Sequence, residues 1–586
     1  MQSLLPNFLQ QSGSPLRSPH VEQSSFFASA FASHTQPMSG HPRSSLFLRP
    51  TRRDLLLCIV TLSFSYLLFS PPLNTQGVSV NPAFASKYSH SWGRFGSFFP
   101  ASSSTSCPQI NNEVIWSETV KPVGFGVAGS GKFRQGTKVW AGGEEEEEDD
   151  EFQTLSTVLK AHSPGWTIFE KLYIHNGSFY VVTENKDEYP ELRMMISTGL
   201  PANNEPGNIE AREPRGNEIK YITPIEAAKF WGSRVYRLDG TTFLFNDGQF
   251  IDHYYHFAAE LLLGAWRAYA SYDQDISANG ETTLVAPKRM WFLHQSVNEW
   301  RDKLNFNPTL LFALFPRTAI LYPEDFRDFV NLTLSDKPKA FVLDRAILAD
   351  RSAAFRGPFT NPTARTVAGA LQVGTTSKWW WEPVRRAVLR YAGLDEDIIA
   401  RNLEGHGAVD PVLLHGAGVD VVEPLSLPGT YNPVITYISR QNSRRHLTPE
   451  SHADLVNALT ERAKKLNWEL VIVEAEKMSK EEQFALAGRT TIMLGVHGNG
   501  LTHLIWMPAT PRSAVIELFY KGGFARDYQW TAHALGIRHF AIQHDVIHTS
   551  PSIPLVSYPE GFQGTAITVS GKVVADLIEN QLAGRL

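Results

Sequence analysis

The last third of the chain alternates short, β-branched apolar runs with longer stretches whose apolar residues recur at helical spacing. This pattern predicts four strand–helix units in succession, and such units form a parallel sheet covered by helices on both faces. Ligands of these sheets bind at the carboxyl ends of the strands. The predicted strands cover residues 433–440, 470–473, 490–496 and 513–519, and the predicted helices cover 449–466, 479–487, 501–507 and 527–535.

The region that begins near residue 154 is also predicted to be globular, with a more varied pattern. Segment 172–183 alternates as a hairpin does, and Asn176-Gly177 stands at the expected turn. Residues 401–431 are rich in Gly and Pro and are the predicted hinge before the last third. Further predicted helices cover 257–272, 299–306 and 379–392, and further predicted strands cover 289–293, 319–321 and 340–348.

The first quarter of the chain predicts no packed core. Residues 1–54 are rich in Ser, Pro and Gln and are predicted to be a disordered cytosolic tail. Residues 55–73 carry no charge and are long enough to span a bilayer, and the arginines before them place the N-terminus in the cytosol. Residues 74–153, which end in the acidic run 144–151, predict a flexible stem. We therefore expect a single-pass membrane anchor with the globular part across the membrane.

Composition narrows the class of protein further. A chain of 586 residues predicts two or three folding units. The two cysteines exclude a disulfide framework and a cysteine-based zinc site, and no basic domain points to nucleic acid. Two Asn-X-Ser/Thr sequons, at Asn176 and Asn331, lie on the side of the membrane predicted to be lumenal.

The most distinctive stretch, GVHGNGLTHLIWMP at 495–508, lies between a predicted strand and a predicted helix. The first amides of a helix have no partner within the helix and bind anions together with its dipole. A tight turn without a ligand is the alternative. The residues that would form this anion site are Gly498, Asn499, Gly500 and Leu501, with His497 before them.

Charged residues accompany two other predicted strands of the same sheet. YISRQNSRRHL, at 437–447, places Arg440, Arg444 and Arg445 beyond the end of the first strand, and Glu517 lies in the fourth. Guanidinium groups match the geometry of phosphate, so these arginines are candidates for holding a diphosphate, although a solvated basic loop would look the same.

In the first globular half, His256 and Glu260 are four residues apart and share one face of a predicted helix. Glu260 borders an apolar run at 261–263, and burial there is expected to raise its pKa. An exposed pair without a function is the alternative.

Several motifs for other chemistries are absent or incomplete. The chain has no H-E-x-x-H or G-x-S-x-G motif, and GVAGSGKF at 126–133 lacks the Ser/Thr of a phosphate-binding P-loop. The acidic triplets that begin at Asp273 and Asp395 do not follow predicted strands, as a metal clamp for a nucleotide would. We therefore predict no metal site.

Four segments of the chain resemble family 61 glycosyltransferases, which include plant xylosyl- and arabinosyltransferases of xylan and O-GlcNAc transferases of the secretory pathway. The resemblance covers about residues 240–535 and is closest to fungal members; Glu260 stands where the family more usually has Asp. The segments are HYYHFAAE (253–260), YISRQNSRRHL, EKMSKEEQFALAGRTTIMLGVHGNGLTHLIWMP (476–508) and VIELF (515–519).

The resemblance implies an α/β fold of the GT-B type, in which two Rossmann-like domains face each other across a cleft. The acceptor-side domain would span 154–410, and the domain that binds the nucleotide sugar would span 411–586. It also implies a Golgi or endoplasmic reticulum enzyme that needs neither cofactor nor metal. Such an enzyme inverts the anomeric centre while moving a sugar such as GlcNAc or xylose from a nucleoside diphosphate, expected to be UDP, to a glycan or glycoprotein.

The resemblance also implies residue roles. Arg440 and Arg445 would hold the diphosphate, His497 and the neighbouring amides would stabilise the leaving phosphate, and Glu517 would bind the ribose. Glu260, or His256 through it, would be the base. A membrane-anchored protein that binds a nucleotide or glycan without catalysis, or a metal-dependent phosphoester hydrolase, remains the alternative.

Overall fold

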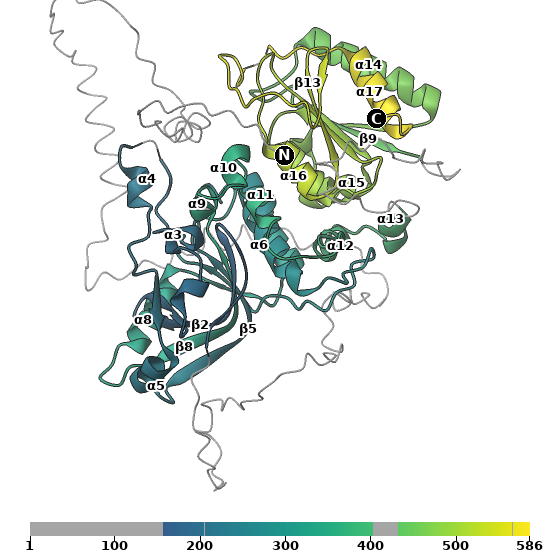
Figure 1. Cartoon of the computed structure of the whole chain (residues 1–586). Helices are drawn as coiled ribbons and strands as arrows, with labels where there is room; N and C mark the ends of the chain where they lie inside the picture. Colours follow the sequence, from purple (N-terminus) through teal and green to yellow (C-terminus); the bar gives the residue numbers. More distant parts are fainter. Residues whose placement is uncertain (1–155, 204, 402–431, 565) are drawn as a thin grey trace, which may run out of the picture. The chain divides into compact units, whose positions relative to one another are not determined.

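The computed structural model describes residues 156–586 apart from 204, 402–431 and 565. The predicted tail (1–54), membrane anchor (55–73) and stem (74–153) lie outside the described residues, as does nearly all of the predicted hinge. Among the helices that are described, none combines the length and the apolar character needed to cross a membrane. Two β-sheets with helices around them make up this part of the chain, which confirms the α/β class (Figure 1).

The first sheet is mixed. Its strands lie in the order β4-β3-β2-β8-β5-β6-β7, and β1 pairs with β2 next to β3. The strands β8, β5, β6 and β7 are parallel, whereas β2 is antiparallel to both β3 and β8. The predicted hairpin is present, with Asn176 and Gly177 at positive φ in its turn. The strands are β1 (Val158–Ser163), β2 (Trp166–His175), β3 (Ser178–Val182), β4 (Ile219–Ile222), β5 (Val235–Phe245), β6 (Arg289–Phe292), β7 (Ala319–Leu321) and β8 (Ala340–Ala349).

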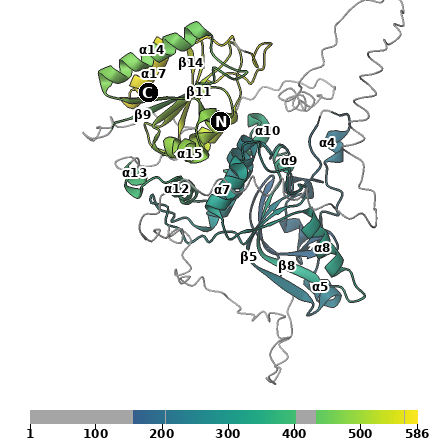
Figure 2. The ribbon, with the colours of Figure 1, turned by 180° about the vertical axis from the view of Figure 1, so that it is seen from behind.

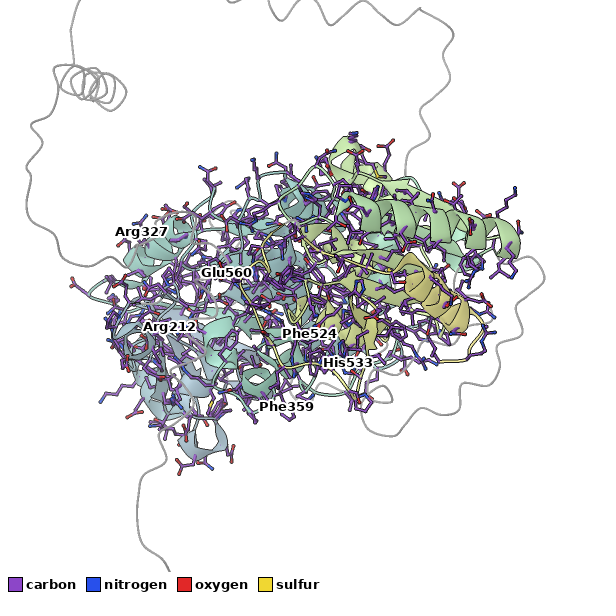
Figure 3. The ribbon with its side chains drawn as sticks, turned by 90° about the horizontal axis from the view of Figure 1, so that it is seen from above. Arg212, Arg327, Phe359, Phe524, His533 and Glu560 are labelled. Atoms are coloured by element: carbon purple, nitrogen blue, oxygen red, sulfur yellow. The ribbon has the colours of Figure 1, made fainter. Side chains whose placement is uncertain are left out.

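Helices α5 and α8 cover opposite faces of this sheet. Trp231 of α5 stacks on Tyr173 of β2, with ring centroids 5.3 Å apart. Phe326 and Phe329 of α8 instead contact Trp291 on the other face, so apolar side chains leave the sheet in both directions. Arg327 points outward from α8 (Figure 3). The helices around this sheet are η3 (Lys186–Glu188), α3 (Leu192–Met195), α4 (Asn208–Ala211), α5 (Pro224–Trp231), α7 (Phe306–Leu314), α8 (Pro323–Thr333), α9 (Arg351–Ala354), α10 (Thr360–Thr363), α11 (Thr366–Ala370), α12 (Glu382–Tyr391) and α13 (Glu396–Arg401).

Two predicted helices of this half differ from the structure. The predicted helix 257–272 consists of the π-helix η4 (His256–Leu262), α6 (Leu263–Tyr269) and the 3₁₀ turn η5 (Ala270–Tyr272). The predicted helix 299–306 is wrong, because α7 begins only at Phe306. Asn305 has a left-handed backbone, and Pro308 fits a first helical turn but not a helix interior.

The second sheet is parallel except at one edge, as its strand–helix pattern predicts. Its order is β10-β9-β11-β12-β13-β14, and only β14 is antiparallel to its neighbour. Strand β10 lies on one side of β9, and the later strands β11, β12 and β13 lie on the other side. The carboxyl ends of the parallel strands β9 and β11 therefore form the topological switch point. The strands are β9 (Val434–Ile438), β10 (Glu469–Val473), β11 (Ile492–Val496), β12 (Ala514–Leu518), β13 (Arg538–Gln543) and β14 (Val546–His548).

Helices cover both faces of the second sheet. Figures 1 and 2 show α14 and α17 side by side on one face, where they pack on the same apolar core. The predicted helix 501–507 is the 3₁₀ helix η7, which begins two residues earlier. The helices are α14 (Pro449–Leu466), η6 (Ala475–Lys477), α15 (Lys480–Arg489), η7 (Asn499–Trp506), α16 (Asp527–Ala534) and α17 (Gly571–Leu582).

The helices of the first half pack directly against η7, α15 and α16 of the second. Trp381 donates a hydrogen bond from Nε1 to the carbonyl of Ile505 at 2.8 Å. Trp506 donates from Nε1 to the hydroxyl of Tyr254 at 2.9 Å. The π-helix that starts at His256 is therefore fixed next to the carboxyl ends of the second sheet.

Candidate active site

The switch point of the second sheet carries three of the residues singled out in the sequence. Arg440 follows β9 by two residues, His497 directly follows β11, and Glu517 lies in β12. These strands are neighbours, because Gly495 of β11 pairs with Ile438 on one side and with Glu517 on the other. All three residues therefore lie at the carboxyl-terminal end of the sheet, on neighbouring strands.

Glu517 is fully buried between two histidines. Its Oε1 accepts a hydrogen bond from Nδ1 of His497, and its Oε2 accepts one from Nε2 of His539 at 2.7 Å. A carboxylate with both oxygens engaged in the core cannot bind a ribose, so the role expected from the resemblance is corrected. Glu517 instead holds the proton of His497 on Nδ1 and leaves Nε2 for another partner.

His497 lies in an aromatic setting. Its ring stacks on Phe519 at 5.3 Å and contacts the rings of Tyr528 and Phe562. Burial, together with the positive charges of Arg445 and Arg440, lowers the pKa of His497 to about 4, although Glu517 opposes this shift. At neutral pH the imidazole is therefore uncharged.

The three arginines of the 437–447 segment form no ion pair with the described residues. Arg440 donates from Nη1 to the carbonyl of His497 at 2.8 Å. Arg444 donates to Gln563 at 2.8 Å. Arg445 is half-buried, its Nε atom has no partner among the described residues, and burial lowers its pKa to about 10. It remains charged at neutral pH.

The turn between β11 and η7 places free amides at this cluster. The described part of the chain supplies no hydrogen-bond acceptor to the amides of Gly498, Asn499 and Gly500, whereas the amide of Leu501 donates to the carbonyl of Gly498 at 2.9 Å. The expected contribution of the Leu501 amide is therefore corrected. Gly498 also makes room for an arginine, because a Cβ there would lie 1.4 Å from Nη1 of Arg440.

His256 and Glu260 form a hydrogen-bonded pair on the π-helix. Nδ1 of His256 donates to Oε2 of Glu260 at 2.8 Å, and the same oxygen lies 3.0 Å from Nη1 of Arg351. Burial alone would raise the pKa of Glu260, but His256, Arg351 and Arg365 outweigh it and lower the pKa to about 2. The expectation of a raised pKa is therefore wrong, and Glu260 stays ionised.

Arg365 and the start of α16 connect this pair to the second sheet. Arg365 lies 3.0 Å from Asp527 and 3.6 Å from Glu260. The hydroxyl of Tyr255 donates to the carbonyl of Asp527 at 3.0 Å, and the ring of Tyr528 contacts both Tyr255 and His497. The two groups of residues singled out in the sequence thus belong to one connected set of side chains.

Sequence reasoning missed several members of this set. Arg351, Arg365 and His539 stand in segments without a motif, and their roles follow only from contacts with distant residues. Asp527 was expected only as the first residue of a helix. In the described ranges, no group of three or more His, Cys, Asp or Glu side chains could hold a metal ion. Asp273 accepts hydrogen bonds from Thr282 and Thr283, so this carboxylate has a structural role in the loop after η5.

Comparison with known proteins gives a match to a protein family. The family model described as Glycosyltransferase 61 matches residues 254–516. This range contains His256, Glu260, the arginine cluster and His497, and it ends one residue before Glu517. No curated protein matches the chain.

Proposed function

Because the chain belongs to glycosyltransferase family 61, we propose that it transfers a sugar such as GlcNAc or xylose. The donor would be a UDP-linked sugar, and the acceptor would be a hydroxyl of a glycan or glycoprotein. One observation carries this proposal: at the carboxyl end of β11, the arginine cluster forms no ion pair and the amides of Gly498, Asn499 and Gly500 have no acceptor among the described residues. A diphosphate supplies the charge and the acceptor oxygens that they lack.

We propose a GT-B arrangement with an acceptor-side domain at 154–410 and a nucleotide-sugar domain at 411–586. The parallel second sheet supports this, because its switch point is where nucleotides bind in related topologies. The first sheet supports it through its four parallel strands. A type II anchor in the Golgi or endoplasmic reticulum, as the sequence predicts, would place both domains in the lumen.

On the leaving-group side, the proposal assigns charge stabilisation to the protein's own cations. Arg440 and Arg445 would bind the diphosphate, and the amides of Gly498, Asn499 and Gly500 would donate to its oxygens. Negative charge grows there as the bond from the anomeric carbon to the phosphate oxygen breaks, and fixed donors stabilise such charge without reorganising. His497 would take up a proton as the anion binds and would then donate from Nε2. We propose that this arrangement makes a metal ion unnecessary.

On the acceptor side, we assign the base to His256 and a positioning role to Glu260. A carboxylate with a pKa of about 2 is a weak base at neutral pH. Its hydrogen bond keeps the proton of His256 on Nδ1, so Nε2 can accept the proton of the acceptor hydroxyl. The acceptor oxygen would form its bond to the anomeric carbon from the face opposite the diphosphate, which inverts that centre.

The direct test is to incubate the purified protein with a panel of nucleotide sugars and acceptor glycans and to measure released nucleoside diphosphate. We expect one donor to be turned over by the wild type and by the exposed control Glu324→Gln, but not by His256→Ala. Tight nucleotide binding without turnover would instead identify a non-catalytic binding protein. Phosphate release that a chelator abolishes would identify a metal-dependent hydrolase.

A further inference from the structure

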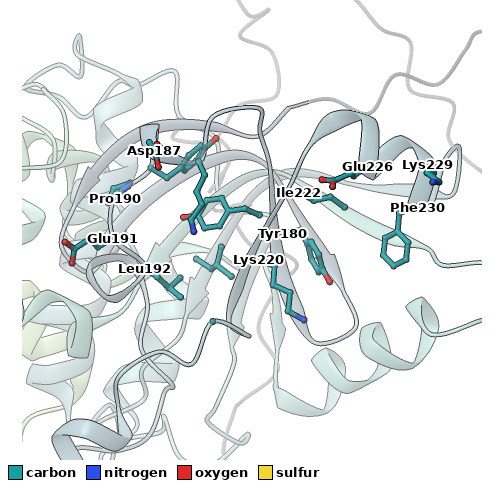
Figure 4. A pocket seen from close by; sticks show the side chains of 15 residues that line it. Tyr180, Asp187, Pro190, Glu191, Leu192, Lys220, Ile222, Glu226, Lys229 and Phe230 are labelled. Atoms are coloured by element: carbon teal, nitrogen blue, oxygen red, sulfur yellow. The ribbon is translucent and has the colours of Figure 1, made fainter.

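A cavity of about 1260 Å³ lies at the free edge of the first sheet (Figure 4). Its walls come from β3, β4, α5 and the segment 186–192, and they include none of the candidate active-site residues. It lies four strand positions from β5, the strand that leads to His256, or about 20 Å across the sheet. The cavity is therefore separate from the proposed site of transfer.

The main chain of β4 presents unused hydrogen-bonding groups to this cavity. Phe179 donates to the carbonyl of Glu218 at 3.0 Å and Thr183 donates to that of Ile222 at 2.9 Å, so alternate groups of β4 face β3. The amides and carbonyls of Ile219 and Tyr221 point the other way. They form no hydrogen bond with the residues that the structure describes. Such an edge can pair with an added strand.

Side chains from both faces of the sheet line the cavity. Lys220 lies next to Tyr180 on the face that α5 covers, and Phe230 of α5 lines the same side. Tyr221 lies on the opposite face, where its ring contacts Tyr189 at 5.7 Å. A ligand that reaches both faces must run along the edge of β4 and send its own groups alternately up and down. An extended polypeptide does so, because its side chains alternate between the two faces, whereas a single sugar ring packed on an aromatic side chain contacts only one face.

Charge distinguishes the two sides. Lys220 and Lys229 line the α5 side, and the carboxylate of Glu226 is engaged there by the amide and hydroxyl of Thr223 at 2.9 and 2.8 Å. Two ammonium groups against one carboxylate leave this side net positive, so it suits a further carboxylate. The opposite side offers the apolar Pro190 and Leu192 and the ring of Tyr221, over which Lys186 lies. Its acidic residues Asp187 and Glu191 disfavour carboxylates there.

We propose that the edge of β4 binds an extended polypeptide in which acidic residues alternate with apolar ones. The peptide would add to the sheet as a strand, with its main chain bonded to Ile219 and Tyr221, its carboxylates near the two lysines and its apolar side chains on the Tyr221 side. This binding is independent of glycosyl transfer, so it can be tested even if the proposed function fails.

The probe is a fluorescein-labelled hexapeptide of alternating glutamate and isoleucine, added to the full chain while its anisotropy is measured. Tyr221→Pro and Tyr221→Ala both remove the ring, but only proline removes the outward amide, and proline is tolerated at that position of an edge strand. We expect the proline variant to bind about tenfold more weakly than the alanine variant, the effect of losing one main-chain hydrogen bond. Thermal unfolding of both variants checks that they remain folded.

Charge reversal gives a second, independent readout. Lys220→Glu with Lys229→Glu should abolish binding of the glutamate peptide and favour a lysine–isoleucine peptide, whereas the control Lys303→Glu should change neither. Equal affinity of the proline and alanine variants, or equal binding of both peptides to the wild type, would overturn the proposal. So would displacement of the peptide by a neutral oligosaccharide, or a dimer of the chain that Tyr221→Pro dissociates.

Discussion

Replacing Glu260 by glutamine perturbs the most highly charged part of the candidate site. The carboxylate is buried, bonded to His256, and close to two guanidinium groups. Burial would raise its pKa, but these cations lower it from 4.5 to about 2. That difference corresponds to about 3 kcal/mol of folding free energy at neutral pH. Breaking a buried ion pair costs a similar amount, about 3–5 kcal/mol.

The direction of the pKa shift determines the pH range in which Glu260 stabilises the folded state. A depressed pKa stabilises the folded state above pH 4.5, and this stabilisation is lost as the pH falls toward 2. Urea unfolding should show Glu260→Gln to be about 3 kcal/mol less stable than the wild type at neutral pH, with the difference vanishing near pH 2. The exposed control Glu324→Gln should change stability by less than about 1 kcal/mol.

The same variant should slow transfer by about 10²–10⁴-fold, because His256 loses the partner that orients it, while calorimetry should show unchanged donor affinity. Wild-type stability and an unchanged pH dependence of unfolding would refute the charge assignment. Reduced stability with full turnover would refute the positioning role alone.

Three other predictions concern the second sheet. Arg445→Ala should weaken donor binding by about 1.5–3 kcal/mol in calorimetry, and unchanged affinity would remove Arg445 from the site. Gly498→Ala should displace the guanidinium of Arg440 and weaken the same binding without unfolding the protein; an unaltered donor affinity would contradict this. Burial lowers the pKa of His497 to about 4 and that of His539 to about 3, so stability should fall as the pH drops below 6.5; equal unfolding free energies at pH 7 and pH 5 would be inconsistent with this.

Elements with strong local signals were predicted well. Helix α14 has the predicted bounds because Thr448 caps it, Pro449 fits its first turn, and Asn467 ends it in a left-handed conformation. The strand–turn–helix at His497 was also predicted, since β-branched apolar residues, glycines and helical spacing follow one another there. These features depend on neighbours in the sequence.

Features that depend on distant contacts were not predicted. Strand β5 is central to the first sheet, yet charged residues interrupt its apolar pattern. The ionised state of Glu260 depends on Arg351 and Arg365, which approach it from segments about a hundred residues away. The pairing of Glu517 with His539 likewise requires β12 and β13 to be neighbours. The spacing of residues along the chain contains none of this information.

The π-helix has a consequence for how this region tolerates change in length. The amide of Leu263 bonds to the carbonyl of Ala258, five residues earlier, so this turn contains one more residue than an α-helical turn. Deleting a single residue between His256 and Glu260 would restore regular α-helical winding and leave α6 undisturbed. It would also leave His256 three positions before Glu260, which is still on the same face of a regular helix but about 60° away around its axis. One extra residue thus sets the angle at which this helix presents its histidine–carboxylate pair, and a homologue shortened by one residue there would retain the fold but present the pair at a different angle.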